Sequence, residues 1–163
     1  MSRAADELWM GRALEAAREA GAAGEVPVGA VIVRGGSVLS QAANRTVRDN
    51  DPTAHAETMA IRAAAAALGS WRLEGCNLYV TLEPCAMCAG AMVLARVDRV
   101  VFGAWDDKAG MAGSVADLLR HPKLNHRPDV LAGVRAEECG ALLTQFFSTR
   151  RGGQVVDSPA STA

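Results

Sequence analysis

The sequence predicts a single-domain α/β fold, and three observations support this prediction. Helical and strand patterns alternate along the 163 residues, which favours layers of helices packed on a sheet. A strand pattern at 78–81, a helix pattern through 95 and a strand pattern at 99–103 predict a βαβ unit. A chain of about this length buries roughly 68–70% of its unfolded surface, so it has enough core to fold as one domain.

Apolar periodicity and breaker residues place the elements before that unit. They are a helix at 6–20, strands at 26–33 and 38–43, and a helix at 53–68. Gly21 and Gly24 are stop signals for the first helix, and Gly35-Gly36 is a hairpin signal between the two strands. Asp51-Pro52 announces the second helix, whose alanine run has high helix propensity.

Three elements are expected after the βαβ unit: a short helix at 115–120, a strand at 130–134 and a helix at 137–151. Residues 152–163 are rich in Gly, Ser and Pro, which is typical of a disordered tail. We therefore expect one domain over residues 1–151, followed by that tail.

His55, Cys85 and Cys88 are candidate metal ligands. Zinc prefers imidazole nitrogen and thiolate sulfur in a tetrahedron, and catalytic sites keep one position open for water. If Cys85 begins a helix, Cys85 and Cys88 lie one turn apart on one face, where both sulfurs reach a single ion. Pro84 suits that helix start, and the exposed amides after it favour the thiolate form.

Glu57 is the candidate catalytic residue. Two residues from His55 on a helix, it points away from the ligand row and is poorly placed as a fourth ligand. We interpret it as a proton carrier beside a zinc-activated water, because zinc lowers the pKa of bound water from about 15.7 to about 7. The alternative is an ordinary first-turn carboxylate stabilised by the helix dipole.

A closed structural zinc site is the alternative for the whole group, with Cys76 or Cys139 as fourth ligand. A structural site has no need of Glu57 and more often shows a second pair of cysteines. Either extra cysteine is better explained as a small buried apolar residue.

Separated segments of the chain resemble the bacterial tRNA-specific adenosine deaminases, within the zinc-dependent cytidine and deoxycytidylate deaminase superfamily. The resemblance covers roughly residues 6–151 and includes the H-x-E and P-C-x-x-C signature of zinc deaminases. The matching segments are Glu25–Ala30, Asn44-Arg45, Asp51–Glu57, Thr81–Cys88, Val100–Ala104, His121-Pro122, Asn125–Arg127, Phe146-Phe147 and Arg150-Arg151.

This resemblance implies a three-layer cytidine-deaminase-like fold, with helices on both faces of a mixed five-stranded sheet. It implies hydrolytic deamination of adenosine to inosine at the wobble (first anticodon) position of tRNA, with one Zn²⁺ per subunit. It also implies that the chain binds the tRNA anticodon stem-loop and forms a homodimer. An anticodon loop is a suitable target because its bases are partly unpaired, which lowers the cost of flipping one out.

The resemblance also assigns substrate contacts. It implies that Asn44 contacts the flipped base, that Val28 and Leu82 match positions near the pocket, and that further residues line the RNA path. Those further residues are Asp106, Lys108, His121, Asn125, Phe147 and Arg150. From local sequence alone, Asn44 is also consistent with a turn residue, and Val28 and Leu82 with core packing.

Three residues beside the expected RNA path keep two interpretations each. Asp106 accepts a hydrogen bond from a ribose 2′-hydroxyl in one and caps its own loop in the other. Trp105 stacks on a base or covers the core or a dimer contact. Phe147 is a stacking platform or a core residue, and the pair Phe146-Phe147 allows one ring to face inward and the other to face the RNA.

Composition narrows the class of protein. A net charge of −1 and a pI near 6.3 exclude a protein that holds nucleic acid by bulk cationic attraction. Four cysteines without a disulfide framework, a charged N-terminus and no apolar run of membrane length predict a cytoplasmic protein. Two alternatives stay open: a small-molecule deaminase for guanine, cytosine or a nucleoside, and a zinc-stabilised RNA-binding module without catalysis.

Overall fold

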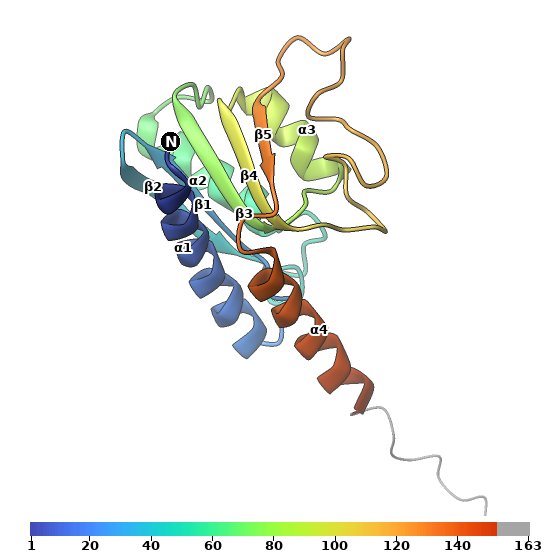
Figure 1. Cartoon of the computed structure of the whole chain (residues 1–163). Helices are drawn as coiled ribbons and strands as arrows, with labels where there is room; N and C mark the ends of the chain where they lie inside the picture. The colour runs from blue at the N-terminus through green and yellow to red at the C-terminus, as the bar shows by residue number, and fades with distance from the viewer. Residues whose placement is uncertain (153–163) are drawn as a thin grey trace, which may run out of the picture.

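The computed structural model describes residues 1–152, with five strands in one mixed sheet (Figure 1). The elements in chain order are α1 (Arg3–Ala22), β1 (Gly29–Arg34), β2 (Ser37–Ala43), α2 (Ala56–Leu68), β3 (Cys76–Leu82), α3 (Ala86–Ala95), β4 (Arg99–Ala104), β5 (Asp129–Ala132) and α4 (Ala136–Gly152). The strand order is β2-β1-β3-β4-β5. β1 is antiparallel to both neighbours, whereas β3, β4 and β5 run parallel. The predicted α/β class and the βαβ unit β3-α3-β4 are confirmed.

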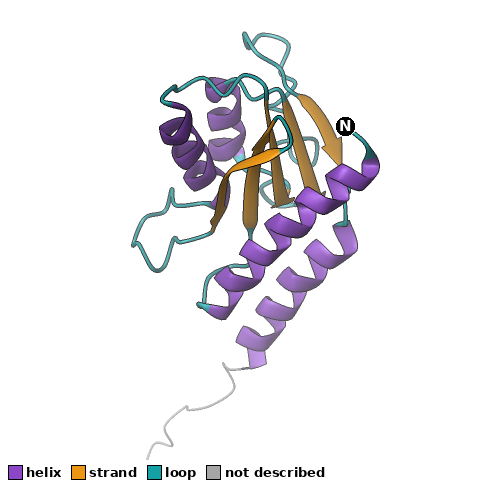
Figure 2. Cartoon of the chain, turned by 90° about the vertical axis from the view of Figure 1, so that its left-hand side faces the viewer, coloured by secondary structure: helices purple, strands orange, loops and turns teal. Residues whose placement is uncertain are grey.

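Helices cover both faces of the sheet, as predicted (Figures 1 and 2). Side chains alternate along each strand, so neighbouring residues face opposite layers. In β1, Ile32 belongs to the core formed with α2 and α3, whereas Val31 and Val33 belong to the core formed with α1 and the first turn of α4. The three-layer arrangement therefore follows from strands that are apolar on both sides.

The hairpin between β1 and β2 forms where the sequence predicts it. Gly35 and Gly36 adopt φ angles of 56° and 76°, a left-handed pair that glycine reaches without steric strain. Such a pair matches the two-residue hairpin turn whose twist suits the flanking strands.

The predicted short helix at 115–120 is wrong. In its place lies an irregular loop with a single isolated bridge between Ala112 and Asp117. Backbone N–H groups that a helix over 115–120 would bond to carbonyls four residues earlier are bonded elsewhere: Leu118 donates to the carbonyl of Met111, and Arg120 donates to the side chain of Asp117. These partners replace the helical hydrogen-bond pattern in this segment.

The ends of the helices differ from the expectation by a few residues. α2 begins at Ala56 instead of residue 53, with His55 as its N-cap. α4 continues to Gly152, the first residue of the predicted tail, and the rest of that tail lies outside the described residues. Within residues 1–152, no helix is both long and apolar enough to cross a membrane.

Candidate active site

The three predicted zinc ligands meet where two helices begin. His55 is the N-cap of α2 and Cys85 the N-cap of α3, and neither side chain caps its own helix. The Nδ1 atom of His55 lies 3.6 Å from Sγ of Cys85 and 3.5 Å from Sγ of Cys88. All three ligand atoms lie within 4.8 Å of one another.

These separations fit a tetrahedral zinc ion. With Zn–S near 2.3 Å and Zn–N near 2.0–2.1 Å, tetrahedral angles place the nitrogen about 3.6 Å from each sulfur. Cys76 and Cys139, the alternative fourth ligands, do not belong to the group. Cys139 packs in the core on the other face of the sheet from Cys88. The donor set therefore has three protein ligands, which is typical of a catalytic zinc site.

The thiols of the two cysteines differ in pKa. Hydrogen bonds from Cys88 and His55 hold the pKa of Cys85 at about 4, far below its ordinary value. The hydrogen bond to Cys85 and burial raise the pKa of Cys88. Cys85 is therefore a thiolate, the form that binds metals, and it lies at a helix N-terminus where negative charge is favoured.

Glu57 is a buried acid next to this group but outside it. It lies in the first turn of α2, and only 4% of its surface is exposed. Burial raises its pKa to about 7, because the charged form is poorly solvated there. The side chain is thus able to take up and release a proton near neutral pH. Its place in the first turn of α2 is also consistent with the alternative interpretation, a carboxylate stabilised by the helix dipole.

A pocket of about 260 Å³ opens beside the candidate ligands. It lies at the carboxyl ends of β3 and β4, where ligands bind in open α/β sheets. Four predicted substrate residues line it: Val28, Asn44, Leu82 and Asp106. The rest of its lining is Val26, Thr46, His55, Ala56, Glu57, Glu83, Cys85 and Ala109.

Asn44 lines this pocket and carries a side-chain oxygen without a hydrogen-bond partner among residues 1–152. Its Nδ2 donates to the carbonyl of Val26 at 3.4 Å, which orients the amide. Its Oδ1 is buried and accepts no hydrogen bond from any described residue. Since buried polar atoms are nearly always paired, the oxygen fits an acceptor for a donor on the substrate.

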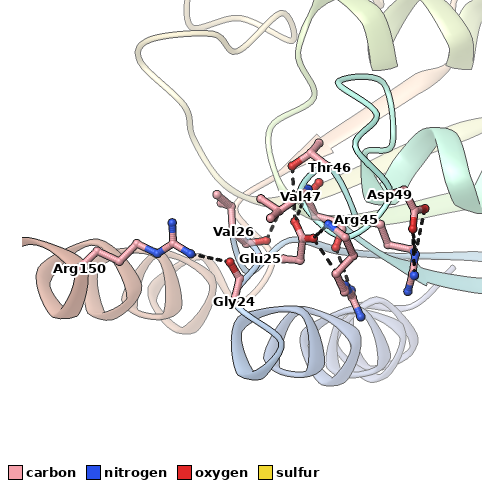
Figure 3. A network of polar contacts seen from close by, with 10 residues as sticks. Gly24, Glu25, Val26, Arg45, Thr46, Val47, Asp49 and Arg150 are labelled. Carbon is pink, nitrogen blue, oxygen red and sulfur yellow. Dashed lines mark hydrogen bonds and ion pairs between the residues drawn. The ribbon is translucent and has the colours of Figure 1, made fainter. Parts of the chain in front are cut away.

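Glu25 holds the segment that carries Asn44, a role that the sequence did not reveal (Figure 3). Its buried carboxylate accepts from the backbone N–H of Val47 at 3.2 Å and of Arg48 at 2.7 Å. The Arg48 guanidinium in turn donates to the carbonyl of Asn44 at 3.1 Å. The only sequence signal was an acid placed directly before the apolar strand pattern at 26–33.

The predicted RNA-path residues separate into two groups. Lys108, Phe147 and Arg150 line a second hollow of about 340 Å³, together with Arg151. Arg150 also donates to the carbonyl of Gly24 at 2.6 Å (Figure 3). Its guanidinium stacks on the ring of Phe146. His121 and Asn125, in contrast, line neither hollow, and their RNA contacts stay predictions.

Asp106 and Trp105 each show one of their two interpretations. Oδ1 of Asp106 accepts from the backbone N–H groups of Lys108 and Ala109 and so caps its own loop. Trp105 packs edge to face on Phe102 with ring centroids 4.9 Å apart, yet 51% of it is exposed. The predicted contact of Asp106 with a ribose and the stacking of Trp105 on a base stay predictions.

Comparison with known proteins agrees with this geometry. Residues 3–104 match the cytidine and deoxycytidylate deaminase zinc-binding region. The chain is 50% identical to the tRNA-specific adenosine deaminase of Bacillus subtilis over 146 residues, which are 90% of this chain and 91% of that one. It is 48% identical to the Agrobacterium fabrum protein of the same name, covering 88% of this chain and 94% of that one. The chain belongs to the tRNA-specific adenosine deaminase family.

Solved structures place this deaminase close to two kinds of enzyme. One, from a study of A-to-I editing by tRNA deaminases at the wobble position, has a TM-score of 0.80 at 47% identity and covers 83% of this chain and 98% of that one. A guanine deaminase from Bacillus subtilis has a TM-score of 0.61 at 33% identity, covering 96% of this chain and 98% of that one. The same fold therefore occurs in a tRNA deaminase and in a guanine deaminase, so the fold alone does not determine the substrate.

Proposed function

We propose that the chain converts adenosine to inosine at the wobble position of tRNA by zinc-dependent hydrolysis. The observation that carries the proposal is the group of His55, Cys85 and Cys88 beside buried Glu57, at the foot of a pocket sized for one base. Three protein ligands leave a coordination position open, and the adjacent acid supplies proton transfer. The similarity to tRNA-specific adenosine deaminases supports the same assignment.

A zinc ion held by these three residues would supply an activated water as nucleophile at neutral pH. Glu57 takes one proton from the attacking water and delivers it to the purine ring nitrogen; it then takes the second proton from the new hydroxyl group on the base and delivers it to the departing amino group. Water and adenosine thereby become inosine and ammonia. Val28 and Leu82 flank the base by apolar contact, and Oδ1 of Asn44 accepts a hydrogen bond from it.

RNA is the better substrate class because the surroundings of the pocket suit a polyanion. No described residue of α4 lines the pocket, so this helix does not wall off the base-binding site. The second hollow adds Lys108, Arg150 and Arg151 with the half-exposed ring of Phe147. Cations and an aromatic ring are the groups that hold single-stranded nucleic acid. We propose the anticodon stem-loop as the bound part of the tRNA.

The proposal includes one zinc ion per subunit, a homodimer and a cytoplasmic location. Leu94 of α3, exposed by 75%, and the half-exposed Val115 support an interface with a second copy. All four cysteines are free, as expected for a protein from a reducing compartment.

The test compares RNA and free-base substrates with a matched inactive variant. The zinc-loaded chain is incubated with an anticodon stem-loop carrying adenosine at the first anticodon position, and inosine is read by sequencing. Glu57→Gln keeps the size of the side chain and should lower kcat by about 10²–10⁴-fold while the zinc content, measured by mass spectrometry, stays at one per chain. Full activity of Glu57→Gln would refute the role of Glu57.

A guanine deaminase is the second candidate, because solved guanine deaminases share the fold at 26–33% identity. The same preparation is therefore assayed with guanine and with free adenosine. Xanthine formation without inosine in the RNA would favour this candidate, whereas inosine in the stem-loop alone would support the tRNA enzyme.

A further inference from the structure

A second buried carboxylate stands at the back of the pocket. Glu83 follows β3 and precedes the ligand turn, and only 2% of its surface is exposed. Within residues 1–152 no arginine or lysine pairs with it; instead the loop 105–114 surrounds it. Glu83 lies in one of the segments that resemble the deaminase family, but the sequence alone indicates no role for it.

The hydrogen bonds of Glu83 fill its acceptor sites. Oε1 accepts from the backbone N–H of Asp106 at 3.0 Å and from the Ser114 hydroxyl at 2.5 Å. Oε2 accepts from the backbone N–H groups of Ala112 at 2.9 Å and Ser114 at 3.0 Å. A carboxylate has about four such sites, so none is left for a substrate. Glu83 is thus not a second proton carrier beside Glu57.

The loop also closes tightly over this carboxylate. A Cβ atom added at Gly110 would lie 2.2 Å from Cδ and Oε1 of Glu83 and 2.6 Å from the carbonyl oxygen of Asp106. Only glycine allows this approach. The main chain reinforces the contact, because Met111 donates to the carbonyl of Pro84 at 2.8 Å.

The loop held in this way carries the groups that face the substrate. Asp106 and Ala109 line the base pocket, and Lys108 lines the basic hollow next to α4. Oδ1 of Asp106 then sets the turn that presents Lys108. Glu83 therefore connects the ligand turn before α3 to the loop that forms one wall of both hollows.

We propose that Glu83 is a positioning residue for RNA recognition, which acts by fixing loop 105–114 against the ligand turn. This inference rests on the proposed function. It predicts that disturbing Glu83 weakens RNA binding without removing zinc or the chemistry at Glu57.

The test uses two variants that break the contact from opposite sides. Glu83→Gln replaces one acceptor oxygen with an NH₂ group that meets other donors, and Gly110→Ala pushes the loop off an intact carboxylate. Each should raise KM for the stem-loop by about tenfold or more, with kcat within about threefold of wild type and zinc at one per chain. Their controls are Glu74→Gln, an exposed glutamate, and Gly140→Ala, where an added Cβ meets nothing within 4 Å.

Two further readouts separate positioning from general destabilisation. Trypsin should cleave after Lys108 faster in Glu83→Gln than in wild type, well below the Tm of both. If Glu83 acts through the loop, Lys108→Ala combined with Glu83→Gln should lose less than the product of the two single losses. Ser114→Ala removes only the hydroxyl, one of the four hydrogen-bond donors to Glu83. It therefore tests the same contact with a smaller disturbance if Glu83→Gln does not fold.

Several outcomes would overturn the inference. The inference is overturned if KM is unchanged in folded Glu83→Gln and Gly110→Ala. It is also overturned if the losses of Glu83→Gln and Lys108→Ala multiply in the double variant, or if lower activity is caused by loss of zinc. A wild-type chain that leaves the stem-loop unconverted would overturn the proposed function as well. An active wild type with unaffected variants would overturn only the role of Glu83.

Discussion

Replacing Asn44 with alanine should separate activity from stability. In the free protein, the buried Oδ1 atom has no partner, which costs about 1–3 kcal/mol. The variant removes that cost but also removes the long 3.4 Å bond from Nδ2 to the carbonyl of Val26, worth about 0.5–1.5 kcal/mol. The two effects nearly offset each other, so the Tm should shift by less than about 4 °C for a chain of this size.

The effect on turnover should be much larger. The adenine amino group is a hydrogen-bond donor, and without Oδ1 it enters the pocket unpaired. A loss of about 1–3 kcal/mol in transition-state binding corresponds to a fall of roughly 5–150-fold in kcat/KM. The assay is inosine formation in the stem-loop, paired with thermal melting of the same samples.

Asn77→Ala is the matched control, because Asn77 lies on β3 and lines none of the hollows described above. It should leave kcat/KM unchanged. The reasoning about Asn44 is refuted if Asn44→Ala melts more than 10 °C lower while its kcat/KM, measured far below the Tm, equals that of wild type. That result would make Asn44 a structural turn residue, which was its alternative interpretation.

Two further predictions concern stability and assembly. Arg99 forms two hydrogen bonds with buried Asp6 and lowers its pKa. Asp6→Asn should therefore cost about 2–3 kcal/mol at pH 7, and the Tm difference from wild type should shrink as the pH falls below about 4, where the unfolded carboxyl takes up its proton. Melting curves at several pH values test this, and a pH-independent difference contradicts it. Leu94→Glu on α3 should dissociate the proposed homodimer in light scattering, whereas Leu8→Glu on α1, also exposed, should not; a dimeric Leu94→Glu protein places the interface elsewhere.

The sequence predicted those parts of the fold that depend on local pattern. Apolar runs bounded by breaker residues located all five strands, and Gly35-Gly36 located the hairpin. The same reasoning failed at 115–120, because the amide of Leu118 bonds to the carbonyl of Met111 and the amide of Arg120 bonds to the side chain of Asp117, outside the helical pattern. No periodicity in a short window contains that information.

The candidate site was predictable to a similar extent. The spacing of His55, Cys85 and Cys88 indicated a metal group because ligand chemistry is specific, and the structure brings these residues together. Glu25 and Glu83 were not given roles, since a buried carboxylate bound by backbone amides has the same sequence signature as an exposed one. Only the packed structure shows that their partners are N–H groups from distant loops.

Several acidic side chains lie in or near the pocket, which is unexpected beside a negatively charged RNA. The structure shows a different set of hydrogen-bond partners for each of them. The oxygens of Glu25 and Glu83 are bonded to backbone amides, so their charge is compensated within the loops that they hold. Asp106 uses one oxygen in the same way. Glu57 alone combines deep burial with a pKa raised to about 7, so it is the acid in this region suited to exchanging a proton with a substrate. What occupies their oxygens thereby distinguishes the acids that shape the site from Glu57, the acid proposed to carry protons in the reaction.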